Sequence, residues 1–406
     1  MTLDDVRTVC FVGAGTMGCA NSLVAAVSGY EVVLHDAQED NLDAVSARHE
    51  GIAAFLVQSG YCSSDDVAAG RARVSIVADL AQAASNADLV SESVFEDLDL
   101  KRQIHRQLDQ VAPRRTILTT NTSALLVSEI ENVVRRGELF AALHSHLGSL
   151  LFDIVGGPRT ASSTIDVLRR YVLSLGGVPL VLKKENRGYV FNAINGPLLA
   201  MAMTLLLRGH ATRDEIDRAW MSDRGAPLGP FGMMDLFGLD VILDSWRRPS
   251  TDSSREALRA EVVPFLTQYV EAGKLGLKSG NGFYDYPAPA FQEPAFLSAG
   301  PSPQIASEAL LSTLLGSAVS LVANDVVTPE EVDLAWTTAT ALDVGPFGIL
   351  DQLGIEPFSE ILQNQLAAGL LAAESVDLCL GYALGLGLEE GERGETDPPA
   401  RRRAGA

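Results

Sequence analysis

Residues 7–18 read RTVCFVGAGTMG, a short apolar run that leads into three glycines with the spacing GxGxxG. A helical pattern, ANSLVAAVSG, follows directly, and a second apolar run, EVVLHD, occupies residues 31–36. A strand, a glycine turn, a helix and a second strand in this order form the start of a right-handed βαβ unit. The order therefore predicts a parallel sheet that begins at the amino-terminal end of the sequence.

Further short apolar runs, most of them separated by amphipathic helical segments, continue this alternation. They lie at residues 74–77, 88–94, 116–121, 140–144 and 178–182. Alternating strands and helices with apolar strands are typical of a doubly wound sheet covered on both faces. We therefore predict an α/β Rossmann domain, with a mainly parallel sheet, over residues 1–183.

The three glycines have distinct roles in a dinucleotide site. The first permits the tight turn, the second lets the pyrophosphate approach the backbone, and the third lets the helix pack on the strand. The helix that follows points its free N–H groups at the phosphates. A carboxylate at the end of the second strand accepts hydrogen bonds from ribose hydroxyls and so favours NAD over NADP. The sequence predicts an NAD site formed by Gly13, Gly15, Thr16, Met17, Gly18 and Asp36.

The glycine motif alone leaves alternatives open, because FAD uses the same fingerprint and a glycine turn can lack a ligand.

From about residue 185 the pattern changes to long helical runs, and the chain repeats itself. Residues 216–240 align without gaps with residues 332–356, and both segments contain GPFG. This similarity predicts an all-α carboxyl-terminal region made of two copies of one helical module. We place the copies at 184–286 and 300–380, with a Pro-rich linker between them. The charged, Pro- and Gly-rich tail, 388–406, is predicted to be disordered.

Composition narrows the class of protein. The formal charge of −21 argues against nucleic acid or an anionic membrane as the main partner. We expect no signal peptide and no apolar stretch long enough to span a bilayer. The four cysteines have no CxxC pair and no Cys/His metal spacing, which predicts no metal site and a reduced, cytoplasmic location.

The chain resembles the 3-hydroxyacyl-CoA dehydrogenase family over about residues 1–380. The matching blocks, in order, are VGAGTMG (12–18), DLVSESVFEDLDLKRQIHRQLD (88–109), NTSAL (121–125), LFAALH (139–144), RGYVFN (187–192), PLGPFGMMDLFGLD (227–240) and GLKSGNGFYDY (276–286). The resemblance implies an NAD-dependent oxidoreductase that interconverts 3-hydroxyacyl and 3-oxoacyl thioesters between its two domains. It also implies that the second helical copy replaces a dimer partner, so we expect a monomer or a homodimer.

The same resemblance implies roles for individual residues. Ser123 would hydrogen-bond the 3-oxygen of the substrate, and His144 would be the general base. Asn192 would contact the substrate or hold the catalytic geometry, whereas Glu308 stands at its place in the second copy and makes that copy structural. Histidine suits the role because its ordinary pKa lies near neutrality. The residues implied near the cofactor are Glu96, Lys101 and Asn121.

The match fails just after His144. The family usually reads HFxNP there, with a glutamate about twelve residues after the histidine. This chain reads HSHLGS, and its best-aligned acid is Asp153, nine residues on. We predict that Asp153 orients His144. Two alternatives stay open: the pair is broken, or His146 is the base.

The second departure from the family concerns the group to which the acyl chain of the substrate is attached. In the family, basic side chains around the early helical hairpin meet the CoA phosphates, but residues 49–66 contain no lysine or arginine. Phosphate recognition without such groups is weak, so we weigh an acyl carrier protein against CoA. Relatives in polyketide extender-unit pathways oxidise carrier-bound hydroxyacyl groups. Basic residues that could meet an acidic carrier are Arg114, Arg115, Arg135 and Arg136.

Two other functions remain as alternatives. One is an NAD-binding homologue with little activity and a structural or regulatory role, which the altered loop after His144 motivates. The other is a dehydrogenase of a free hydroxy acid, which would need no basic groups for CoA.

Overall fold

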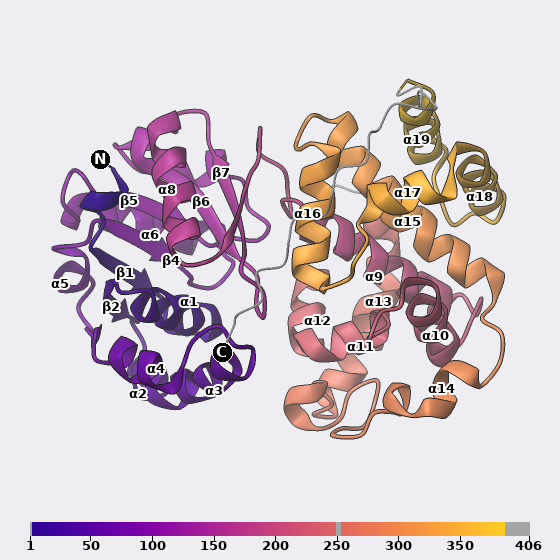
Figure 1. The fold of residues 1–406 in the computed structure, drawn as a ribbon, viewed down its shortest axis with the longest axis horizontal. Helices are drawn as coiled ribbons and strands as arrows, with labels where there is room; N and C mark the ends of the chain where they lie inside the picture. The colour runs from indigo at the N-terminus through magenta and orange to yellow at the C-terminus, as the bar shows by residue number, and fades with distance from the viewer. Residues whose placement is uncertain (1, 249–252, 386–406) are drawn as a thin grey trace, which may run out of the picture.

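The computed structural model describes residues 2–248 and 253–385, which form two lobes side by side (Figure 1). The amino-terminal lobe is built on one eight-stranded sheet, and the carboxyl-terminal lobe is helical. The predicted tail, 388–406, lies outside the described residues. The strands are β1 (Thr8–Val12), β2 (Glu31–His35), β3 (Val74–Ile76), β4 (Leu89–Glu92), β5 (Ile117–Thr120), β6 (Phe140–Ser145), β7 (Leu151–Gly156) and β8 (Val178–Val181).

The sheet has the order β3-β2-β1-β4-β5-β6-β7-β8, and every pair is parallel except β6 with β7. The prediction of a mainly parallel, doubly wound sheet is confirmed. The chain passes from β1 outward to β3 and then returns to β4 beside β1. In open α/β sheets this switch point opens a crevice at the carboxyl ends of the strands, where ligands bind.

Side chains of each strand alternate between two apolar cores. In β1, Val9 and Phe11 pack in the core that includes α1, α3, α4 and α8, whereas Cys10 and Val12 pack in the core that includes α5, α6 and α7. This two-residue period is what a strand buried on both faces requires. The helices of this lobe are α1 (Thr16–Val27), α2 (Glu39–Asp43), α3 (Val45–Gln58), α4 (Ser64–Arg71), α5 (Leu80–Ala84), α6 (Leu98–Val111), α7 (Val127–Glu131) and α8 (Ser162–Ser174).

Strand β7 was not among the predicted strands. It runs antiparallel to β6 and carries Asp153 in its middle. The strand pairs with β6 on one side and with β8 on the other. Six residues interrupted by an acid give a weak sequence signal, and pairing with two neighbours overrides it.

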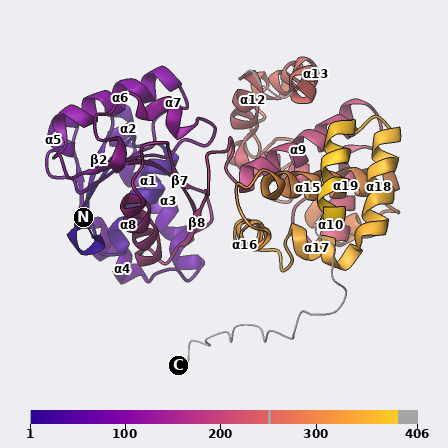
Figure 2. The same ribbon diagram turned by 90° about the horizontal axis from the view of Figure 1, so that it is seen from above.

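The carboxyl-terminal lobe contains two equivalent sets of helices. An offset of 116 residues carries α10 onto α16 and α11 onto α17, end to end. The helices are α9 (Phe191–Leu207), α10 (Arg213–Arg224), α11 (Pro230–Phe237), α12 (Leu239–Arg247), α13 (Ser253–Glu271), α14 (Pro294–Ser298), α15 (Gln304–Ala323), α16 (Pro329–Thr340), α17 (Pro346–Leu353), α18 (Ile355–Ala367) and α19 (Ala373–Gly385). Helix α9 and its counterpart α15 pack against each other at the centre of this lobe (Figure 2).

Each copy uses the same device to hold its GPFG turn. Asp217 accepts hydrogen bonds of 2.9 and 3.0 Å from two backbone N–H groups of the first GPFG block. Asp333 accepts bonds of 2.7 and 2.9 Å from the equivalent groups of the second block. The carboxylates satisfy N–H groups at the start of the next helix, which explains why this aspartate recurs in both copies.

Helix α15 corrects the expectation that no apolar stretch is long enough to span a bilayer. With 20 residues it is long and apolar enough to cross a membrane by length and composition, although more than half of its most apolar window is buried in the protein. It packs against α9, α18 and α19. We therefore interpret it as a core helix. The predicted linker between the copies also holds structure, since α14 lies in it and Phe291 and Phe296 are buried.

Candidate active site

The three glycines of the turn between β1 and α1 are required for different reasons. Gly13 has φ +106°, and a Cβ on Gly18 would lie 1.7 Å from the carbonyl oxygen of Gly13. The backbone of the turn therefore requires glycine at both positions, whether or not a ligand binds. A Cβ on Gly15 would meet nothing within 4 Å. Gly15 therefore leaves an open cradle at the start of α1, where Thr16 and Met17 form the first turn. This cradle fits the predicted pyrophosphate.

Asp36 follows β2 and braces this turn. Its Oδ2 accepts a hydrogen bond of 2.8 Å from the backbone N–H of Ala14. Arg48, which the sequence analysis did not single out, donates to the Ala14 carbonyl at 2.6 Å and to the side chain of Asn41 at 3.2 Å. The carboxylate thus lies beside the turn, at the position from which ribose hydroxyls are recognised in this motif.

Asn121 joins the carboxyl ends of three neighbouring strands. Its amide nitrogen donates to Ser93 Oγ at 3.1 Å, after β4, and its Oδ1 accepts from the backbone N–H of Ser145 at 2.8 Å, at the end of β6. Asn21 on α1 donates to Ser145 Oγ at 2.8 Å. These bonds fix the crevice edge on which the predicted cofactor and catalytic residues meet.

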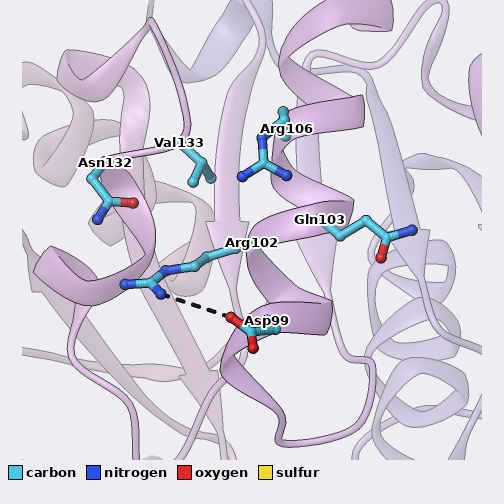
Figure 3. A pocket seen from close by; sticks show the side chains of 6 residues that line it. All are labelled: Asp99, Arg102, Gln103, Arg106, Asn132 and Val133. Carbon is cyan, nitrogen blue, oxygen red and sulfur yellow. Dashed lines mark ion pairs between the residues drawn. The ribbon is translucent and has the colours of Figure 1, made fainter.

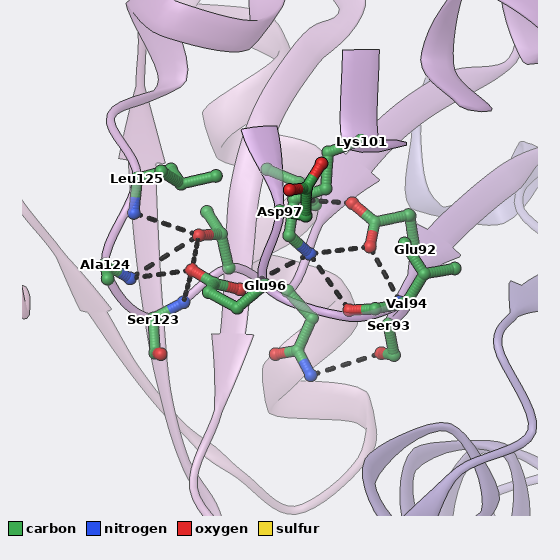
Figure 4. A network of polar contacts seen from close by, with 12 residues as sticks. Glu92, Ser93, Val94, Glu96, Asp97, Lys101, Ser123, Ala124 and Leu125 are labelled. Atoms are coloured by element: carbon green, nitrogen blue, oxygen red, sulfur yellow. Dashed lines mark hydrogen bonds and ion pairs between the residues drawn. The ribbon is translucent and has the colours of Figure 1, made fainter. Parts of the chain in front are cut away.

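Glu96 holds the loop that carries Ser123 (Figure 4). Its Oε1 accepts from the backbone N–H groups of Ser123 and Ala124 at 3.1 and 3.0 Å, and from the hydroxyl of Thr122. In the described part of the chain the Ser123 hydroxyl itself has no hydrogen bond. Glu96 therefore fixes the loop and leaves that hydroxyl available.

Lys101 lies beneath this loop and not on the surface. Its side chain is 1% exposed and its Nζ lies 2.7 Å from Glu92 Oε1 and 3.5 Å from Glu96 Oε2. Burial would raise the pKa of Glu92, but the charge of Lys101 and the hydrogen bond from His105 outweigh it and bring the value to about 2. Lys101 supports the Ser123 loop through Glu96.

His144 and Asp153 face each other on β6 and β7. The register pairs them directly, and His144 Nδ1 lies 3.0 Å from Asp153 Oδ2. His146 Nε2 lies 2.8 Å from the same oxygen. The predicted contact between His144 and the shorter acid is therefore present, because the shortened loop leaves the two strands in this register. Burial and the nearby His146 lower the pKa of His144, although Asp153 opposes them.

Helix α9 approaches these histidines from the other lobe. The ring of Tyr189 lies 5.2 Å from the ring of His144, and Phe191 meets the ring of His146 edge to face at 5.5 Å. Asn192 follows Phe191 in the first turn of α9. Tyr189 was not predicted as a site residue; its buried hydroxyl has no hydrogen-bond partner among the described residues.

His144, His146 and Asp153 also form a cluster of metal-ligating type. Their ligand atoms lie within 4.8 Å of one another in the described part of the chain. The carboxylate already accepts hydrogen bonds from both rings. We therefore assign no metal ion to it.

A groove of 510 Å³ lies on the flank of the sheet (Figure 3). It is lined from α6 by Asp99, Arg102, Gln103 and Arg106 and from the segment after α7 by Asn132 and Val133. None of these residues was predicted to belong to the site, and we place the active site in the crevice instead.

The arginines considered for a carrier protein do not lie beside the crevice. Arg115 binds Asp88, and Arg135 and Arg136 both bind Asp109. They precede β5 and β6, as does Arg114, so all four lie toward the amino-terminal edge of these parallel strands. Ser123 and His144 lie at the opposite edge of these strands.

Comparisons with known proteins identify the family of the chain. The model of the 3-hydroxyacyl-CoA dehydrogenase NAD binding domain matches residues 8–186, and that of the family's C-terminal domain matches 188–286 and again 306–386. The mitochondrial hydroxyacyl-coenzyme A dehydrogenase of Sus scrofa is 32% identical over 295 residues, which cover 69% of this chain and 91% of that protein.

Solved structures are similar as well. A diketoreductase that acts on dicarbonyl compounds is 35% identical with a TM-score of 0.63, over 69% of this chain and 99% of that one. The 3-hydroxybutyryl-CoA dehydrogenase of Escherichia coli has a TM-score of 0.77 over 94% of this chain and 98% of that one. At 22% identity it shows a shared fold that extends through both helical copies.

Proposed function

Because the chain belongs to the 3-hydroxyacyl-CoA dehydrogenase family and is an NAD-dependent oxidoreductase of that type, we propose that it interconverts a 3-hydroxyacyl thioester and the 3-oxoacyl thioester. The observation that carries the proposal is the hydrogen bond of 3.0 Å between His144 and Asp153 at the edge of the crevice. A histidine that a buried acid orients is the acid–base group this reaction needs.

The chemistry follows from the tautomer of His144. An ionised carboxylate can only accept, so Nδ1 must carry the hydrogen and Nε2 keeps its lone pair. In the oxidation direction Nε2 removes the proton of the 3-hydroxyl, and Asp153 stabilises the imidazolium that forms. Ser123 donates its hydroxyl hydrogen to the 3-oxygen. NAD, held by the glycine turn and Asp36, would supply the acceptor for the hydride of C3.

We propose that the acyl group of the substrate is attached to a carrier protein and not to CoA. The support is the lack of lysine and arginine in residues 49–66, which cover most of α3 and the start of α4. The exposed face of α3 presents Ala54, Phe55 and Val57 to solvent. CoA carries phosphate groups that need cationic partners, whereas a carrier-bound arm brings its own protein surface. A substrate attached neither to a carrier protein nor to CoA is a second candidate, because a relative with 35% identity acts on dicarbonyl compounds.

The test measures NADH formation from 3-hydroxybutyryl-CoA, from the same acyl group on a carrier protein and from free 3-hydroxybutyrate. The comparison includes His144→Ala, with His210→Ala as a matched control beyond the end of α9. We expect His144→Ala to lower kcat by about 10²- to 10⁴-fold, the usual contribution of an acid–base group. NAD affinity should stay the same in both variants.

Four outcomes decide between the functions. A lower KM for the carrier-linked donor supports the carrier, and a lower KM for the CoA donor overturns that choice. Turnover of the free acid alone identifies the second candidate. NAD binding without turnover of any donor means that the altered loop has ended the chemistry, and the chain is then a binding homologue.

A further inference from the structure

Asp153 accepts hydrogen bonds from two histidines through one oxygen atom. Oδ2 lies 3.0 Å from Nδ1 of His144 and 2.8 Å from Nε2 of His146. The other oxygen, Oδ1, is buried and has no partner among the described residues. Because the residue is completely buried, the two imidazole N–H groups are the donors that stabilise its charge.

The two histidines have different geometric relations to a substrate. His144 uses Nδ1 for Asp153, so its outer nitrogen, Nε2, is left for the substrate. His146 uses its outer nitrogen, Nε2, for Asp153, and only Nδ1, which lies closer to its own backbone, is left. The rings meet edge to face with centroids 4.5 Å apart. This arrangement makes His144 the base and gives His146 a different role.

We propose, on the basis of the function proposed above, that His146 is a positioning residue. By donating from Nε2 to Oδ2 of Asp153, it holds the short carboxylate ionised and in the place from which it orients His144.

The surroundings fix His146 in this role. Its ring packs edge to face on Phe191, and Phe191 in turn lies 5.7 Å from Trp336 on α16 of the second helical copy. The ring is therefore held between Asp153 on one side and the helical lobe on the other. A side chain locked by packing can present its N–H group in a fixed direction.

The groups around His144 and Asp153 shift the pKa values of both residues, and this effect can be measured. Burial would raise the pKa of Asp153, but the hydrogen bonds from His144 and His146 lower it below its ordinary value. The groups that act on His144 are His146, which lowers its pKa, and Asp153 and Glu96, which raise it. Tyr189, whose ring also faces His144, has its pKa raised well above the ordinary value by burial and by those two carboxylates, so it stays neutral.

The test compares two substitutions of similar size. His146→Gln keeps an N–H donor near the place of Nε2, whereas His146→Leu removes it. We expect His146→Leu to lower kcat about 10- to 100-fold, as loss of a partner that orients a functional histidine does in metal sites, with NAD affinity unchanged. His146→Gln should stay within about threefold of the wild type, because the donor is retained.

The pH profile tests whether the imidazole of His146 acts on His144. In the oxidation direction kcat/KM rises with pH as His144 loses its proton. Both variants remove the imidazole that lowers the pKa of His144, so the rising limb should move to higher pH in both. A structural defect would change thermal stability or KM and leave this limb in place.

A second readout does not need turnover. In ¹⁵N-labelled protein, the imidazole shifts of His144 should show hydrogen on Nδ1 in the wild type and a loss of this preference in His146→Leu. If the wild type is inactive but this difference is seen, the proposed function fails and the positioning role stands. If kcat, the pH limb and the tautomer are the same in His146→Leu as in the wild type, the inference is wrong. If His146→Gln is as inactive as His144→Ala, His146 is the base, and the inference is also overturned.

Discussion

Lys101 and Glu92 form an ion pair that water hardly reaches. Their side chains are 1% and 0% exposed, and Glu92 also meets His105 Nε2 at 3.2 Å and Thr120 Oγ1 at 2.7 Å. A buried charge whose partner is removed is left without compensation. The pair lies directly below the loop that Glu96 holds, so its loss affects both stability and the position of Ser123.

We expect Lys101→Met to lower the free energy of unfolding by about 3–5 kcal/mol, the usual effect of leaving one partner of a buried pair. Lys183→Met is the matched control, since Lys183 pairs with Asp325 at the surface. Urea denaturation at pH 7 measures both. The folded state lowers the pKa of Glu92 to about 2 from 4.5, so its contribution is present above pH 4.5 and is lost as the pH falls through 2. Equal losses in the two variants would contradict the prediction.

Single residues of the site were predictable only where a motif placed them. Ser123 and His144 follow from their blocks; Ser123 lies in the loop after β5, and His144 lies near the end of the adjacent strand β6. The contact of Asp153 could be expected but not its double use, because His146 reaches it only through the strand register. Lys101 and Arg48 become interpretable only in the fold, since a charged helix residue in sequence carries no sign that it is buried.

At the scale of elements, the turn between β1 and α1 gives a prediction that separates folding from binding. Gly15→Ala places a methyl group in open space, and alanine at the start of a helix costs less than about 1 kcal/mol relative to glycine. We expect stability to change little and the Kd for NAD to rise at least about tenfold, which is 1.4 kcal/mol. Calorimetric titration with NAD and a thermal melt measure the two quantities.

Gly18→Ala is the contrasting variant. Its methyl group would collide with the backbone oxygen of Gly13, so the turn must shift, at a cost of about 1–3 kcal/mol. The melting temperature should therefore fall in Gly18→Ala even without NAD. A Gly15→Ala protein that binds NAD as well as the wild type would show that nothing approaches the backbone at Gly15.

The strands of the parallel part were predictable because each is a short apolar run between helical patterns. Strand β7 was missed because Asp153 interrupts its apolar sequence and only a short loop separates it from β6. Helix α15 was missed as an apolar stretch because Glu308 interrupts it near its start. In both cases one acid interrupts the apolar pattern, and pairing or packing with distant segments decides the structure.

At the scale of the whole molecule, the two helical copies pack as two subunits of a symmetric dimer would. Trp220 and Trp336 are equivalent residues, and their rings meet at 6.3 Å. Helix α9 packs on its own counterpart α15, and the reciprocal contacts α10 with α15 and α9 with α16 are both present. Contacts between equivalent elements are the mark of a two-fold interface. Here this interface lies within one chain.

This internal symmetry leads to a prediction about assembly. The face of α9 that a second subunit could cover is already packed against α15, which shares its core. A surface that is covered in this way offers no apolar area for a dimer. We therefore predict a monomer of 43.2 kDa, to be checked by size-exclusion chromatography with light scattering over a range of concentrations. A stable species of twice this mass at every concentration would show that another face of the molecule forms an interface, and would contradict the prediction.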